Sequence, residues 1–238
     1  MKKLNLLFLL LAFSLIAFSQ EKDSTSKSNF DLGLHIASRY YWRGLNLSSS
    51  PVFQPTMAYT YKGFTVGSWA SFTFAKEDFQ EVDMFLSYNK KFFTITFNDY
   101  FYFKDSLNYT NNYFDWNKKT TSHLLEGNVE FSNIPNIPFS VLAGVILYGA
   151  DKNNDGDSNF SSYIELRYNF SIKNIDTKLF AGFTPFEGLY ASGFNFVNIG
   201  LSAVKEIKVT DKFSFPISTT FSVNPAKEKV YFIVGLSF

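Results

Sequence analysis

Apolar side chains return at every second position in one segment after another of this 238-residue chain. The last segment places five of them on one face: Val230, Phe232, Val234, Leu236 and Phe238. The positions between them are Tyr231, Ile233, Gly235 and Ser237. A period of two is typical of a β-strand, because successive side chains point to opposite faces of a sheet. The chain is therefore expected to be all-β, with different surroundings on the two faces of its sheet.

Twelve segments follow this pattern. They cover residues 29–44, 51–62, 64–75, 80–89, 92–103, 122–133, 139–150, 160–171, 175–185, 195–207, 213–224 and 229–238. Several reach the roughly 9–11 residues with which a tilted strand crosses a bilayer. An even strand number is typical of single-chain outer-membrane barrels, so we predict a transmembrane antiparallel up-and-down β-barrel of about 12 strands. Weak alternation in 80–89 and 175–185 leaves about ten or fourteen strands as alternatives.

The connections between these segments alternate in length. Those after even-numbered segments are short, for example residues 61–63 and 173–174, whereas 104–121, 151–159 and 185–193 are long. Short periplasmic turns and long extracellular loops are expected of an outer-membrane barrel. The short connection 224–227 departs from this rhythm.

Aromatic residues form 20% of the chain. A soluble β-sandwich also alternates, but it would bury its apolar face with fewer aromatic side chains and would lack the rhythm of short and long connections. In hydrocarbon every backbone polar group must be paired within the protein, and a closed barrel achieves this without a free edge. Because aromatic side chains gather at both membrane interfaces, Tyr40, Tyr41 and Trp42 are expected in the outer girdle and Tyr59 and Tyr61 in the inner one.

The first residues are typical of an export signal. Two lysines precede an apolar run from Leu4 to Phe18, and Ala17 and Ser19 are the small residues that a signal peptidase reads. The run of about 15 residues is short for a spanning helix of roughly 20; a retained N-terminal anchor is the alternative. We expect three parts: a signal peptide (1–19), a polar lead (20–28) and an outer-membrane barrel (29–238).

The expected location is the outer membrane of a Gram-negative bacterium, with its lipid around the barrel. The segment that ends at Phe238 looks like the C-terminal signal that barrel-assembly machineries recognise, so this machinery is an expected partner. With 22 basic and 21 acidic side chains, the chain lacks the concentrated positive charge of nucleic-acid binders. It has no cysteine, which excludes cysteine redox motifs, cysteine zinc sites and a lipoprotein anchor. No cofactor is expected.

Neither an enzyme nor a metal site is expected. The only histidines are His35 and His123, and Ser122 faces away from His123 because neighbours on a strand point to opposite sides. Residues 151–157 have the oxygen ligands and glycine of a calcium loop, but Ser162 stands where such a loop has its closing Glu. A solvated turn is the simpler interpretation.

The polar positions of the alternation are expected to face the lumen, because Arg or Lys on the lipid side costs about 2–4 kcal/mol at the midplane. Eight of them are candidate lumen and selectivity residues: Arg39, Arg43, Gln54, Asp83, Glu126, Glu130, Glu165 and Arg167. We hypothesise that the two early arginines face the three glutamates across a constriction. The long loop 104–121, with Tyr109, Tyr113, Phe114 and Trp116, is a constriction, a ligand platform or an ordinary surface loop.

One stretch resembles a known family. The sequence SRYYWRG at 38–44, followed by Pro51, Gln54, Tyr59, and residues 63–64, 67 and 69–71, resembles the opening hairpin of the TorF-type porins. That family was earlier catalogued as conserved hypothetical proteins of Gram-negative bacteria. Arg39 departs from its pattern, in which an acidic residue is common at this position. The resemblance implies a barrel that serves as a pore.

Together these features predict an outer-membrane pore for passive or weakly selective diffusion of small hydrophilic solutes. About eight strands give a barrel filled by side chains and about sixteen leave an aqueous channel, so a barrel of twelve lies between. The alternative is a non-conducting structural or ligand-binding barrel with a filled lumen.

Overall fold

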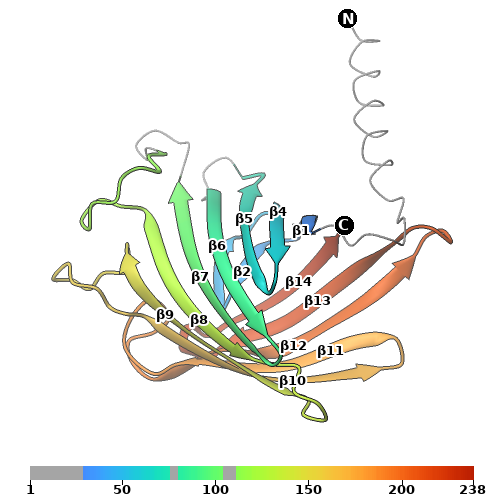
Figure 1. Ribbon diagram of the computed structural model, residues 1–238. Coiled ribbons are helices and arrows are strands. Elements are labelled where there is room, and N and C mark those ends of the chain that lie inside the picture. Colours follow the sequence, from blue (N-terminus) through green and yellow to red (C-terminus); the bar gives the residue numbers. More distant parts are fainter. Residues whose placement is uncertain (1–28, 76–79, 104–110) are drawn as a thin grey trace, which may run out of the picture.

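The computed structural model describes residues 29–75, 80–103 and 111–238. Twelve strands of this part of the chain form one closed antiparallel barrel (Figure 1). They are β1 (Phe30–Ala37), β4 (Val52–Tyr61), β5 (Phe64–Thr73), β6 (Gln80–Lys90), β7 (Phe93–Phe103), β8 (His123–Phe131), β9 (Phe139–Gly149), β10 (Ser162–Ile172), β11 (Ile175–Thr184), β12 (Asn195–Lys208), β13 (Ser214–Asn224) and β14 (Lys229–Ser237). The expected signal peptide and polar lead lie outside the described residues.

The barrel has an up-and-down topology. From β4 to β14 each strand pairs with its neighbours in sequence, and β1 closes the barrel between β14 and β4. Ala37 of β1 pairs with Gly235 on one side and Val52 on the other. The backbone N–H of Phe238 donates to the carbonyl of Leu34 at 2.8 Å, and the return hydrogen bond is 3.0 Å long. The seam between β1 and β14 is short, because their register covers only three residue pairs, from His35↔Ser237 to Ala37↔Gly235.

The predicted all-β barrel of 12 strands is confirmed. Apart from the first segment, the strand bounds agree with the predicted ones to within two residues, and 80–89 and 175–185 are full strands. Among the described residues no helix is long and apolar enough to cross a membrane.

The outer face of the barrel is an apolar belt. One row stands in register across β1, β4, β5, β6 and β7 and consists of Phe30, Tyr59, Val66, Leu86 and Phe97. These side chains are between 47% and 55% exposed. A similar row of exposed side chains crosses β11, β12 and β13 and consists of Leu179, Leu201 and Phe221.

The inner face carries the opposite positions of the same strands. Thr56, Trp69, Asp83 and Tyr100 stand in register across β4 to β7 and line one cavity in the lumen. The period of two in the sequence therefore separates an apolar outside from a largely polar inside.

The two ends of the barrel differ in their connections. The short-turn end carries residues 62–63, 91–92, 132–138, 173–174 and 209–213. Lys62 and Gly63 both have positive φ angles, 50° and 87°, as in the tight turns that suit the twist of a β-hairpin. The long-loop end carries the longer connections and one short one, the 3₁₀ turn η2 (Pro225–Lys227).

Candidate functional site

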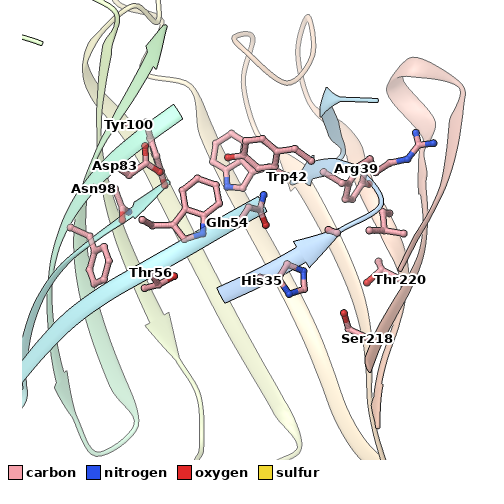
Figure 2. Close-up of a pocket in the computed structure, with 16 residues that line it drawn as sticks. His35, Arg39, Trp42, Gln54, Thr56, Asp83, Asn98, Tyr100, Ser218 and Thr220 are labelled. Carbon is pink, nitrogen blue, oxygen red and sulfur yellow. The ribbon is translucent and has the colours of Figure 1, made fainter. Parts of the chain in front are cut away.

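Between β1 and β4 the chain leaves the barrel wall and forms a separate two-stranded sheet, β2 (Tyr40–Trp42) with β3 (Leu45–Ser48). We name residues 38–51 the lumen hairpin. Its side chains Arg39, Tyr40, Tyr41 and Trp42 line the same cavity as inner-face residues of the wall (Figure 2). The hairpin therefore lies inside the barrel.

The prediction that residues 29–44 form one strand is wrong beyond Ala37. Arg43 and Gly44 have φ angles of 48° and 86°, and two such residues in succession reverse the chain as a tight hairpin turn. Residues 38–44 keep the alternation of β1, although the chain leaves the barrel wall after Ala37 and turns into the lumen.

The placement of Tyr40, Tyr41 and Trp42 in an outer aromatic girdle is also wrong. These rings pack inside the barrel, where their centroids lie 5.5 Å from Trp69, 4.9 Å from Tyr231 and 5.6 Å from Tyr100, respectively. Their aromatic surface is covered by lumen side chains rather than presented to the outside. Tyr59 and Tyr61 remain exposed on the outer face near the short-turn end.

Arg43 at the tip of the hairpin reaches the far wall of the barrel. Its guanidinium forms an ion pair with Glu126 of β8 and donates to Asn128 at 2.9 Å. It also donates to the hydroxyl of Tyr190 at 3.0 Å and lies 4.8 Å from the ring centroid of Tyr163. The side chains of Arg43 and Glu126 are 9% and 0% exposed, so the pair is almost fully removed from water.

Two further contacts fix the tip. The side-chain amide of Asn224 donates to the carbonyl of Gly44 at 2.9 Å. A Cβ added to Gly44 would lie 1.9 Å from the carbonyl oxygen of Val197, so only glycine fits against β12 here. Burial raises the pKa of Tyr190, in the loop before β12, so its hydroxyl stays neutral beside Arg43. The tip is packed against the wall rather than hanging free.

A second polar network occupies the wall below the tip. Arg167 pairs with Glu165 at 2.6 Å and with Glu130 at 3.0 Å. Asn198 donates to Glu165 at 3.0 Å and accepts a hydrogen bond of 2.9 Å from the hydroxyl of Tyr41. The hydrogen bond from Tyr41 to Asn198 thereby joins the hairpin to a polar network of β8, β10 and β12.

The other side of the lumen is hollow. A cavity of about 510 Å³ lies against the hairpin and reaches from β4–β7 to β13 and β14. In Figure 2 Asp83, Asn98 and Tyr100 stand on one side of it, with Ser218 and Thr220 on the other. The arrangement can hold water and small polar solutes next to the hairpin.

The family model described as "Bacterial protein of unknown function (Gcw_chp)" matches residues 21–214. The chain belongs to this family. The matched region includes the lumen hairpin and its contacts with Glu126, Asn128 and Tyr190. No curated protein matches the chain. The description of the Gcw_chp family names no activity, so the function has to be argued from the geometry.

The structure brings only part of the hypothesised charge arrangement of this Gcw_chp barrel together. Arg43 meets Glu126, but Glu130 and Glu165 share Arg167 instead. Arg39 donates to Asn46 within the hairpin at 3.3 Å, and its guanidinium carbon lies 5.9 Å from the ring of Tyr231. The two early arginines therefore do not form one basic patch. Gln54 and Asp83 line the cavity, and the role of these residues in selectivity stays a prediction.

Several residues of the site had not been singled out in the sequence. They are Glu81, Tyr100, Tyr163, Tyr190, Asn198 and Asn224. Alternation within their strands places Glu81 with Asp83 and Tyr163 with Glu165, so this signal was available. Tyr190 comes from a loop, where no periodic pattern indicates which way a side chain points.

The two histidines lie in different places. His35 Nδ1 is 2.9 Å from the hydroxyl of Ser237 in the lumen wall. His123 lies on the opposite face of the sheet, 2.7 Å from Asp99 and 2.8 Å from the carbonyl of Tyr113. No Ser–His–Asp arrangement joins them among the described residues. The expectation that the protein is not an enzyme stays a prediction.

The described part of the long loop does not enter the lumen. Trp116 stacks on the imidazole of His123, with centroids 3.8 Å apart, and Tyr113 donates to Asp99 at 3.1 Å. Asp99 stands in register with Met84 and Leu125 on the outer face. The described part of the loop thus folds over the outside of β7 and β8, which argues against its role as a constriction. Tyr109 lies outside the described residues.

The proposed solvated turn at 151–157 is held by its own first residue. The Asp151 carboxylate accepts hydrogen bonds from the backbone N–H of Ser161 at 2.8 Å and from its hydroxyl at 2.7 Å. It also accepts from the amide of Asn159 at 3.3 Å. These donors occupy the carboxylate oxygens of Asp151, the first ligand position of the calcium-loop pattern.

Proposed function

We propose that the protein is an outer-membrane pore for passive or weakly selective diffusion of small hydrophilic solutes, narrowed by the lumen hairpin. The observation that carries the proposal is the cavity of about 510 Å³ that lies beside the hairpin inside a closed, polar-lined barrel. The hairpin fills the side of β8 to β12, and the cavity leaves the side of β4 to β7 hollow.

The apolar belt supports a membrane location. Soluble monomers rarely expose contiguous apolar patches larger than a few hundred Å², yet rows of Phe, Leu and Val cross the outer face here. In lipid this belt is buried, and closure of the sheet pairs backbone groups within the protein. The short-turn end then faces the periplasm, and the segment that ends at Phe238 is available to barrel-assembly machinery. Residues 1–19 act as the export signal in this proposal.

The charges at the constriction support weak selectivity. Arg43 is paired with Glu126, and Arg167 lies between Glu130 and Glu165, so most of the charge beside the tip of the hairpin is paired. The stretch that resembles the TorF-type porins begins at Ser38 and contains this hairpin.

Single-channel recording tests the proposal. The refolded protein in a planar lipid bilayer is expected to give discrete, reproducible current steps, small because the hairpin narrows the lumen, with a weak ion preference in a salt gradient. A silent bilayer with folding confirmed separately would contradict the pore.

Arginine on the belt is expected to destabilise the barrel in lipid. Leu201 lies near the middle of β12 on the outer face, so Leu201→Arg should lower the free energy of unfolding in vesicles by about 2–4 kcal/mol. The control is Val209→Arg, at an exposed position of the short-turn end, which should change little. Equal unfolding curves for both variants would argue against a membrane location.

The second candidate function is a non-conducting structural or ligand-binding barrel. It is favoured by the buried ion pair of Arg43 with Glu126, which joins the hairpin to the wall, and by the pairs of Arg167 with Glu130 and Glu165, which fill part of the lumen. The same recording separates the two candidates, because a filled lumen passes no current even when the barrel is folded.

A further inference from the structure

Two carboxylates are buried together in the wall beside the stem of the lumen hairpin. Glu81 and Asp83 lie two residues apart on β6, point to the inner face and are 1% and 5% exposed. The ion pairs of the described residues involve other acidic side chains, so neither carboxylate faces a Lys, Arg or His at ion-pair distance. Both oxygens of Glu81 lack a well-formed hydrogen bond within the described residues.

Neutral oxygen atoms surround the pair. The hydroxyl groups of Tyr40, from the hairpin, and Tyr102, from β7, face Glu81 together with Asp83. One oxygen of Asp83 accepts a hydrogen bond of 3.4 Å from the backbone N–H of Phe101. Asp83 and Tyr40 also line the cavity of about 510 Å³, so the Asp83 side of the pair borders the lumen (Figure 2).

Two adjacent carboxylates removed from water cannot both keep an uncompensated charge, so the pair either shares a proton or binds a cation. Hard divalent cations prefer ligand sets made only of oxygen and keep several water ligands. No group of three or more acidic, His or Cys side chains within the described residues is arranged for a metal, so neutral oxygens have to complete the coordination. Tyrosine hydroxyls and water from the cavity provide them.

We propose that Glu81 and Asp83, with the hydroxyls of Tyr40 and Tyr102, bind a divalent cation that enters from the lumen. Because Tyr40 belongs to the hairpin, the ion fastens the stem of the hairpin to β6 and β7. Arg43 fastens the tip to Glu126 of β8. The site does not depend on the pore, since it requires only the folded barrel.

Terbium luminescence tests the site on the full chain refolded in detergent. Tb³⁺ replaces Ca²⁺ at oxygen sites and is excited through nearby aromatic rings, here Trp69 beside Asp83 in register. Saturable emission is expected, and excess Ca²⁺ should displace it. Glu81→Gln and Asp83→Asn should each weaken Tb³⁺ binding by about tenfold or more, because even residues that only orient metal ligands contribute about 10–100-fold to affinity.

The matched control is Glu130→Gln, a lumen carboxylate that already has Arg167 as its partner, and Tb³⁺ should bind it as it binds the wild type. Tyr40→Phe removes only the hydroxyl, keeps the ring next to Trp69 and should also weaken Tb³⁺ binding. This variant tests the site even if the carboxylate variants fail to fold. Ca²⁺ should raise the unfolding temperature of the wild type but not of Glu81→Gln. Equal Tb³⁺ affinity of wild type, Glu81→Gln and Asp83→Asn, or no saturable emission at millimolar Tb³⁺, would overturn the site.

Discussion

Replacing the lumen hairpin by a tight turn is expected to raise single-channel conductance several-fold. Ala37 of β1 and Val52 of β4 are paired across the sheet, so an Asn-Gly turn can join them in place of residues 38–51. The strands β2 and β3 are not part of the barrel sheet, and the replacement removes only the hydrogen bonds of Ser38 with Val234 from the seam with β14, so the barrel should still close. Without the hairpin, only wall side chains fill the lumen. The measurement is single-channel current in a planar bilayer.

The control for this replacement is a similar shortening at the same end of the barrel. Lys152 and Ser158 form an isolated bridge, and an Asn-Gly turn in place of residues 153–157 should leave the conductance unchanged, because that turn lies outside the lumen. If the wild type and both shortened variants conduct alike, current does not pass the hairpin, and its role as the constriction is lost.

The strands could be predicted because each one faces two different surroundings. Leu201, for example, lies between Gly200 and Ser202, and this alternation indicates which side chains face outward without knowledge of any other strand. The error at residues 38–44 has the same origin, because Tyr40 and Trp42 alternate with polar positions in a hairpin that only packs inside. Arg43 has a positive φ angle, which is uncommon for a residue with a side chain. Apart from Gly44, no residue type therefore indicated a turn at this position.

The pairing of the candidate site could not be predicted from local patterns. Alternation indicates that Arg43 and Glu126 are polar and inward, but they are 83 residues apart, and their meeting depends on how far the hairpin crosses the lumen. Glu81 is the converse case. It lies on the same face as Asp83 by its spacing, yet only the packing of Tyr40 and Tyr102 around it shows that it is buried without a cationic partner.

Arg43→Met is expected to destabilise the docked hairpin strongly. The substitution removes the charge that neutralises Glu126, whose side chain is 0% exposed, and breaking a buried pair by removing one partner costs about 3–5 kcal/mol. Asn128 and Tyr190 lose their donor at the same time. The cost should appear in the free energy of unfolding or, if the hairpin leaves its place first, as larger and noisier single-channel currents.

The double variant Arg43→Met with Glu126→Gln distinguishes the contribution of the ion pair from that of the other contacts of the hairpin tip. Replacing both charges by uncharged side chains of similar length removes the buried, unpaired carboxylate, so much of the lost stability should return. Arg167→Met is the matched comparison. It should cost less because Arg167 and Glu130 are 19% and 31% exposed, so water can solvate Glu130, and because the buried Glu165 keeps hydrogen bonds from Tyr163 and Asn198. If Arg43→Met were as stable as the wild type and conducted alike, the tip would be held by the contacts of Gly44 with Asn224 and Val197, and the ion pair would be a consequence of docking rather than its cause.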